Sequence, residues 1–256
     1  KRRLGEVTVS FHPAGHVLGS AQIMVDDGFE RWVVTGDYKL QNDGVSQAYV
    51  QLSCDVLITE CTFGLPVYQW KDQSIIMEEI DLWWKENSKN KQNSVIFAYS
   101  LGKAQRILGN LKNIHGPIIC HGAVENMNKV HEQMGIKFPK RKILDNKIKK
   151  FNLDCALILA PPSSQNSTWL RKFRPIKTAM ASGWMTLRGA RRRRGSERGF
   201  VLSDHLDWKG LNEVIKNSGA RKILFTHGYT SQCAQWFAEK GYQTAELHMD
   251  FDTDGD

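Results

Sequence analysis

Short apolar runs that alternate with polar positions dominate the first 60 residues. Four such runs, rich in Val and Ile and separated by Gly or Asp turns, cover residues 7–11, 21–25, 32–35 and 56–59. This pattern predicts β-strands. The sequence Asp26-Asp27-Gly28, between the second and third runs, is typical of a hairpin turn. Because no long helical pattern precedes residue 70, the opening of the chain is predicted to be an antiparallel block.

The period changes after residue 70. Ile76, Ile80 and Trp83 follow the i, i+4, i+7 spacing of one helix face. Further helices are predicted over 102–113 and 124–134, and they alternate with apolar runs at 95–99, 118–120, 153–160 and 178–182. Such alternation of strands and helices predicts a parallel α/β unit.

The first pattern returns from Gly199. Strands are predicted at 200–203 and 223–226, and helices at 208–217 and 231–240. Gly219 follows the first of these helices and is a candidate left-handed C-cap. We therefore expect a discontinuous host domain, residues 1–66 and 191–256, with an α/β domain of residues 67–190 inserted into it.

Composition fits a globular protein with a real core, since 41% of the 256 residues are hydrophobic and 24% are charged. No run of 18 apolar residues predicts a membrane span, and no apolar stretch follows the first charges as in a secretory signal. The five cysteines are scattered and never spaced C-x-x-C, which favours a reducing cytoplasm. The net charge of +8 favours a polyanionic partner, of which nucleic acid is the commonest.

Polar residues beside glycines follow three of the predicted strands. They are His16, Asp37 and His227. Imidazole and carboxylate are the ligands of hydrolytic zinc sites, although a single histidine at a strand end is more often structural. Glu60 and His205 also follow strands, and a carboxylate near a histidine fixes its tautomer and prepares it for proton donation. Each residue also has a purely structural interpretation: Glu60 as a cap of a helix or turn, and His205 as a residue at the start of a helix.

Five motifs resemble, in order and spacing, those of the β-CASP nucleases of the metallo-β-lactamase superfamily. They are Pro13-Ala14-Gly15-His16-Val17-Leu18-Gly19-Ser20-Ala21, Thr35-Gly36-Asp37, Thr59-Glu60-Cys61-Thr62-Phe63-Gly64, Ser203-Asp204-His205-Leu206-Asp207-Trp208 and Thr226-His227-Gly228. The stretch from Ala181 through the arginines to His205 is similar to bacterial ligase-associated DNA exonucleases. The resemblance implies an α/β fold: a metallo-β-lactamase αββα sandwich with an inserted β-CASP domain.

The resemblance also implies roles. His16 corresponds to a ligand of one zinc, Asp37 to a carboxylate that bridges two zincs, and His227 to a ligand of the second. Glu60 and His205 correspond to an acid–histidine pair in which His205 protonates the leaving oxygen. Two Zn²⁺ ions are implied, with Mn²⁺ as an alternative, and a bridged pair of metals suits phosphodiester hydrolysis.

The chain departs from the family in one respect. The motif H-x-H-x-D-H, expected before Val7, is absent from the sequence, and His12 cannot replace it. We therefore expect the chain to begin partway through a longer reading frame, with an N-terminally incomplete sandwich and part of its core uncovered. Alone, it is expected to bind zinc poorly and to cleave little or nothing.

Three groups of residues are predicted to contact substrate. Ser100, Gly102 and Lys103 lie where a strand leads into a helix, a place where backbone N–H groups and a lysine can hold phosphate; an ordinary strand–helix turn is the alternative. Ser182 and Gly183 form a second small-residue turn. The densest charge comprises Arg191, Arg192, Arg193 and Arg194, and it suits phosphate, although a solvated loop has the same composition.

Several functions stay open at this point. The leading one is a DNA exonuclease in repair, acting on single-stranded DNA, with a DNA ligase or helicase as partner by family resemblance alone. The alternatives are an RNA-processing nuclease on the same scaffold, a non-catalytic nucleic-acid-binding protein, and a small-molecule metallohydrolase. The large insertion and the arginine run disfavour the last of these.

Overall fold

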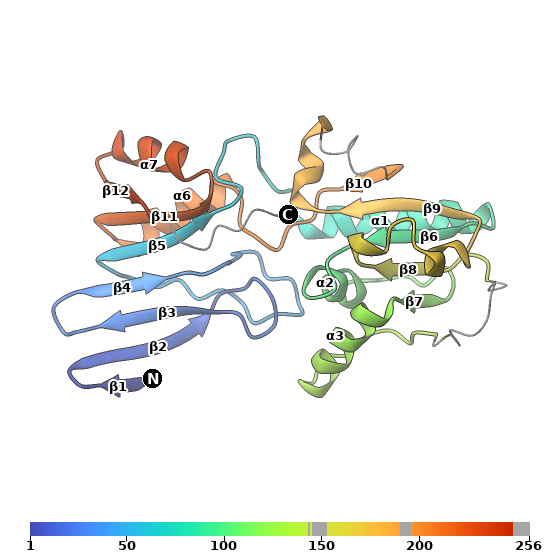
Figure 1. The fold of residues 1–256 in the computed structure, drawn as a ribbon, viewed down its shortest axis with the longest axis horizontal. Helices are drawn as coiled ribbons and strands as arrows, with labels where there is room; N and C mark the ends of the chain where they lie inside the picture. Colours follow the sequence, from blue (N-terminus) through green and yellow to red (C-terminus); the bar gives the residue numbers. More distant parts are fainter. Residues whose placement is uncertain (143, 145–152, 190–195, 248–256) are drawn as a thin grey trace. The chain divides into compact units, whose positions relative to one another are not determined.

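The computed structural model describes residues 1–142, 144, 153–189 and 196–247 (Figure 1). The arginines 191–194 lie outside this range. The chain divides into two compact units. Unit 1 comprises residues 1–42, 46–69 and 205–256, and unit 2 comprises residues 43–45 and 70–204.

Among the described residues, unit 1 is built on a seven-stranded sheet in the order β1-β2-β3-β4-β5-β11-β12. Strands β1 to β4 are antiparallel to one another, as predicted for the runs that form β2, β3 and β4. The fourth predicted run, β5, is instead parallel to β4, and β11 and β12 continue the parallel part of the sheet. The strands are β1 (Arg2–Leu4), β2 (Val7–Pro13), β3 (Ala21–Asp26), β4 (Arg31–Val34), β5 (Val56–Cys61), β11 (Lys222–Gly228) and β12 (Gln243–Glu246).

One face of this sheet carries the core of unit 1. Met24, Val33, Leu57 and Ile223 lie opposite one another on four adjacent strands and pack with residues of α6 (Trp208–Ser218) and α7 (Thr230–Ala238). Helix α6 begins at its cap Asp207 and ends at Gly219, which is left-handed as predicted.

The opposite face is apolar but only partly covered. Ile23, Val34, Ile58 and Leu224 form a second row across the same four strands. All four are half-buried, and none belongs to a buried cluster of the described residues. Phe11, which pairs with Ile23, is 66% exposed. This face is therefore an apolar surface that the described residues cover only in part.

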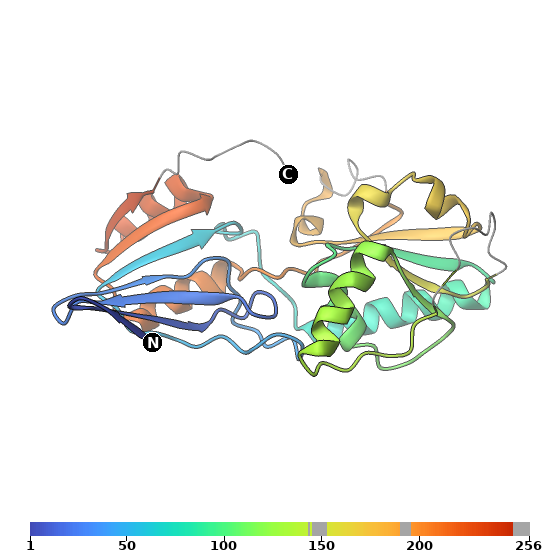
Figure 2. The same cartoon turned by 60° about the horizontal axis from the view of Figure 1, so that its bottom comes forward.

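The sheet of unit 2 has five parallel strands in the order β10-β9-β6-β8-β7. They are β6 (Asn93–Phe97), β7 (Ile118–Cys120), β8 (Leu157–Ala160), β9 (Ile176–Ala181) and β10 (Arg198–Phe200). One side packs on α1 (Gln73–Lys89), α2 (Lys103–Gly109) and α3 (Gly122–Gln133). The other packs on the short helices α4 (Thr168–Arg171) and η2 (Gly183–Thr186), and η1 (Pro162–Ser164) follows β8 (Figure 2). The alternation of strands and helices thus gives the parallel unit predicted.

The second boundary between the units differs from the expected one. The sequence interpretation assigns residues after 190 to the host domain, whereas β10 pairs with β9 in unit 2 and the unit extends to Asp204. The reason is packing: Phe200 is fully buried against Trp83 of α1, and Leu202 joins the same cluster. Residues 201–203, predicted as strand, are not in one.

No helix in the described ranges combines the length and the apolar character needed to cross a bilayer.

Candidate metal centre

Strand direction explains why the predicted ligands of unit 1 lie near one another. β2, β4, β5 and β11 all run the same way, because β2 and β4 flank the antiparallel β3 and the others are parallel to β4 (Figure 1). Their carboxyl ends therefore meet at one edge of the sheet. Such an edge is where α/β folds present functional groups.

His16 is held by a tight loop after β2. The hydroxyl of Ser20 accepts hydrogen bonds from the backbone N–H groups of His16 and Val17, both at 3.2 Å. Gly15 has φ +76°, and a Cβ at this position would lie 2.2 Å from the carbonyl oxygen of Lys39. Glycine is therefore required for the loop to approach this backbone so closely.

Asp37 follows β4 and is positioned by its neighbour in sequence. The Tyr38 ring is fully buried, and its hydroxyl lies 2.8 Å from the hydroxyl of Thr59. The carbonyl of Tyr38 accepts a hydrogen bond from the N–H of Leu206, which draws the His205 segment to the same edge. The Asp37 side chain remains 46% exposed, with an oxygen 3.8 Å from Nε2 of His16.

Glu60 and His205 form a direct pair. Nδ1 of His205 lies 2.9 Å from Oε1 of Glu60, and Oε2 of Glu60 accepts the N–H of Thr62 at 2.9 Å. Burial of Glu60 would raise its pKa, but the charge and hydrogen bond of His205 and the bonds from Thr62 outweigh it, so the pKa is lowered. Glu60 is therefore an anion in neutral solution. It accepts the Nδ1 proton of His205 and so directs Nε2 as the ring's other functional atom.

Three of these residues form a cluster that fits a divalent cation. His16, Asp37 and His205 each offer one ligand atom, and these atoms lie within 4.8 Å of one another. The rings of His16 and His205 are 4.8 Å apart at a 58° angle, and Phe63 packs edge-on 6.0 Å from His205. Two imidazoles and a carboxylate are a zinc-type donor set, and the Glu60–His205 bond is the outer support that such ligands usually have.

His227 lies at the same sheet edge but outside this three-residue cluster. It has φ +54° at an irregularity where the register of β11 on β5 shifts, and its carbonyl accepts a bond from Sγ of Cys61 at 3.1 Å. The following Gly228 passes so close to Cys61 that a Cβ would lie 2.3 Å from its carbonyl oxygen. The side chain of His227 is exposed, and its role as a ligand stays a prediction.

The predicted substrate residues of unit 2 make bonds within the unit. Nζ of Lys103 is buried 2.5 Å from a carboxylate oxygen of Asp204. The N–H of Gly102 donates to Gln105 Oε1 at 2.8 Å, and Gln105 Nε2 donates to the carbonyl of Ser100 at 2.9 Å. These bonds stabilise the start of α2, so a phosphate contact here remains a prediction that must compete with them.

The second predicted turn is similarly engaged. The hydroxyl of Ser182 caps η2 by accepting the N–H of Trp184, and both Ser182 and Gly183 are buried. Contact of these two residues with substrate stays a prediction. The arginines 191–194 cannot be placed, because they lie outside the described residues.

Sequence reasoning missed a buried charge network. The Arg106 guanidinium is 1% exposed and bonds to the carbonyl of Ser203 and to Gln73, with Asp204 3.7 Å away. Burial lowers the pKa of Arg106, and Asp204 opposes that effect. The sequence signal for this network is Asp204, which precedes His205 in the motif of residues 203–208 and to which the family resemblance assigns no role.

The curated relatives include nucleic-acid enzymes. The chain is 30% identical over 243 residues to a probable DNA ligase of Opitutus terrae, covering 94% of this chain and 24% of that protein. It is 27% identical over 161 residues to an RNase J-like protein of Methanocaldococcus jannaschii, with 57% and 37% covered. Integrator complex subunit 11 of Gallus gallus matches at 24% identity, with 87% and 45% covered. The chain thus spans less than half the length of these relatives. They support the metallo-β-lactamase superfamily at modest identity.

No family model matches the chain. Among solved structures, a crystal structure of a protein of unknown function from Enterococcus faecalis V583 aligns with a TM-score of 0.60 at 12% identity. The alignment covers 97% of this chain and 64% of that one, and it supports the α/β fold alone.

Proposed function

We propose that this chain carries part of the active centre of a metal-dependent nuclease of the β-CASP type. The observation that carries the proposal is the cluster of His16, Asp37 and His205 backed by the buried Glu60. Relatives whose names specify a ribonuclease and a DNA enzyme support a phosphodiester substrate.

His16 and Asp37 would hold a Zn²⁺ ion, with Mn²⁺ as the alternative, and His227 would serve a second ion. When bound, such ions activate water and neutralise charge on the phosphate. The Glu60 carboxylate keeps the proton of His205 on Nδ1, so Nε2 is the atom that exchanges a proton or contacts a metal. Protonation of the leaving oxygen by His205 is the step that we assign to this pair.

The favoured substrate is single-stranded DNA in a cytoplasmic repair reaction, with exonucleolytic digestion. The match to a probable DNA ligase covers 94% of this chain and supports DNA as the substrate. The match to the RNase J-like protein supports the RNA alternative over a smaller share of the chain. A ligase or helicase would be the protein partner. Because DNA and RNA differ at the 2′-hydroxyl, cleavage of matched DNA and RNA strands separates the two substrates.

The test is cleavage of end-labelled single-stranded DNA and of the matched RNA by the protein with Zn²⁺ or Mn²⁺. Asp37→Asn is expected to lower turnover by about 100-fold or more, as loss of a central electrostatic group does, without changing the thermal unfolding midpoint. Glu213→Gln, an exposed carboxylate on α6 of the same unit, is the control. Full activity of Asp37→Asn would refute the proposal, and faster cleavage of RNA would replace the DNA assignment.

A further inference from the structure

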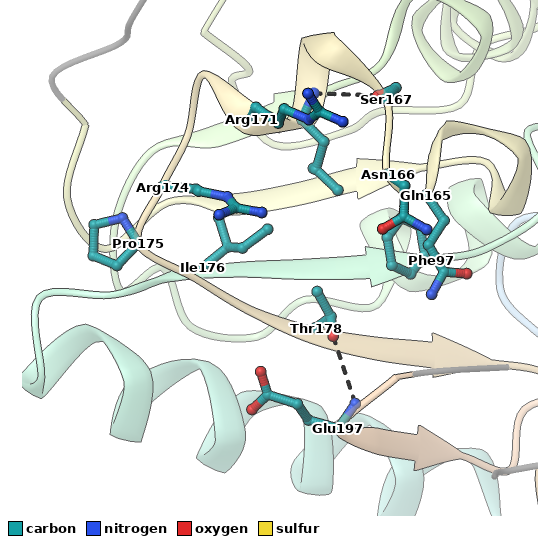
Figure 3. A pocket seen from close by; sticks show the side chains of 11 residues that line it. Phe97, Gln165, Asn166, Ser167, Arg171, Arg174, Pro175, Ile176, Thr178 and Glu197 are labelled. Carbon is teal, nitrogen blue, oxygen red and sulfur yellow. Dashed lines mark hydrogen bonds between the residues drawn. The ribbon is translucent and has the colours of Figure 1, made fainter.

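Unit 2 contains a cavity of about 630 Å³ on the sheet side that carries the short helices. It lies over β9, with α4 and the preceding residues 165–167 along one wall and Glu197 along another (Figure 3). Its volume is within the range of pockets for small ligands, roughly 300–1,000 Å³. Every lining residue that the structure describes belongs to unit 2.

Two cations at this cavity have no acidic partner in the described part of the chain. Arg171 and Arg174 line it, both are exposed, and neither forms an ion pair there. Glu197 is the one acid among the described lining residues, and Lys177 neutralises it at 2.9 Å. The guanidinium charges are therefore left for an anion, and their planar forks match the oxygens of a phosphate.

The rest of the lining suits a ligand with a flat, partly apolar body. Phe97 and Leu170 are buried in the cluster beneath the cavity, and Ile176 packs against the same cluster. The amides of Gln165 and Asn166 lie on the side opposite Arg174 (Figure 3). Asn166 has a left-handed φ of +65°. An apolar floor with amide groups on one side and guanidinium groups on the other matches a base joined to a phosphate.

The geometry points to an accessory site in unit 2 that binds a nucleoside phosphate, through Arg171 and Arg174 at the phosphate and Gln165 and Asn166 at the base. The nucleotide is either free or the phosphorylated end of a strand, because both present the same chemistry. The site does not depend on the proposed nuclease function, since it shares no residue with the cluster of His16, Asp37 and His205.

Isothermal titration of the protein with adenosine 5′-monophosphate tests the site. We expect saturable binding of one nucleotide per chain. The double variant Arg171→Ala/Arg174→Ala should weaken it by about tenfold or more, because two charge-assisted contacts are lost. The matched control is Lys85→Ala/Lys129→Ala, which removes two exposed charges from α1 and α3 of the same unit and should change affinity less than about twofold.

Further titrations separate the contributions of the phosphate and of the base to binding. Inorganic phosphate and adenosine should each bind at least about tenfold more weakly than the nucleotide, since each keeps half of the contacts. Arg171→Lys/Arg174→Lys keeps the charge and should bind with intermediate affinity. A 5′-phosphorylated oligonucleotide that competes with the nucleotide identifies a strand end as the source; without competition, the free nucleotide is the source.

Three results would overturn the inference. They are an absence of saturable nucleotide binding, equal weakening by the two alanine doubles, and equal affinity for inorganic phosphate. His16→Ala should leave nucleotide binding unchanged, so a failure of the nuclease assignment and a failure of this site are recorded separately. Hydrogen exchange of β9 in each variant verifies that unit 2 remains folded.

Discussion

The two units treat charged groups in opposite ways. In unit 1, His16, Asp37 and His205 converge at a sheet edge while Asp37 remains 46% exposed to solvent. In unit 2, Lys103 and Asp204 are almost completely buried against each other. Groups that are close together, only partly satisfied by the protein and accessible can bind an ion. Groups that are buried and paired stabilise a fold. The difference favours unit 1 as the chemical centre.

The largest expected effect tests the structural role of the buried pair. Lys103→Met should destabilise unit 2 by about 3–5 kcal/mol, because removing one partner leaves Asp204 buried with a more distant Arg106 as its cation. Urea unfolding measures the loss in the free energy of unfolding, and hydrogen exchange in α2 and β6 locates that loss in unit 2. Lys112→Met, an exposed lysine of the same unit, should change stability by less than about 0.5 kcal/mol. Equal stability of both variants would mean that the pair is not structural.

A smaller effect is expected at the centre of unit 1. Glu60→Gln removes the carboxylate that holds Nδ1 of His205, and should slow phosphodiester cleavage by about 100-fold because the proton donor is no longer held in place. Single-turnover cleavage at saturating metal measures the rate, and Glu213→Gln is again the control. An unchanged rate would contradict the role of the pair in proton transfer. Loss of cleavage together with global unfolding would instead assign Glu60 a folding role.

The smallest expected effect is on the pH dependence of the stability of unit 2. Burial lowers the pKa of His121, whose Nδ1 accepts the N–H of Ala123 and caps α3. Because the pKa of His121 is lowered, folding favours its neutral form. Its contribution to the stability of unit 2 is therefore complete above pH 6.5, the ordinary pKa of histidine, and decreases as the pH falls below that value. His121→Asn keeps a cap and should flatten this dependence. Unfolding midpoints at pH 5 and pH 8 measure it, and equal slopes in both proteins would contradict the assignment.

Local patterns were sufficient to predict most elements. The hairpin at Asp26-Asp27-Gly28 and the left-handed Gly219 are present because their turn chemistry is encoded within a few residues. Strand β10 was assigned to the wrong sheet. Its sequence is that of a strand in either unit, and only the contact of Phe200 with Trp83, distant in sequence, decides which.

The candidate sites also differ in whether they depend on contacts between residues distant in sequence. The strand-end residues of unit 1 could be proposed from sequence because parallel strands bring their carboxyl ends together. The sequence predicts a phosphate contact for Lys103 but gives no sign of its ion pair with Asp204, because that partner is 101 residues away. The cavity beside Arg171 and Arg174 left no motif at all, since it arises where the loop before β9 meets the β9–β10 edge.

The apolar sheet face of unit 1 bears on how the protein behaves in a test tube. Ile23, Val34, Ile58 and Leu224 form a half-buried apolar strip that the exposed Phe11 continues. Such strips bind hydrophobic dyes and lower the concentration at which chains self-associate, an effect that the net charge of +8 opposes only while ionic strength is low. Purified samples of this chain are therefore expected to become turbid as salt is raised.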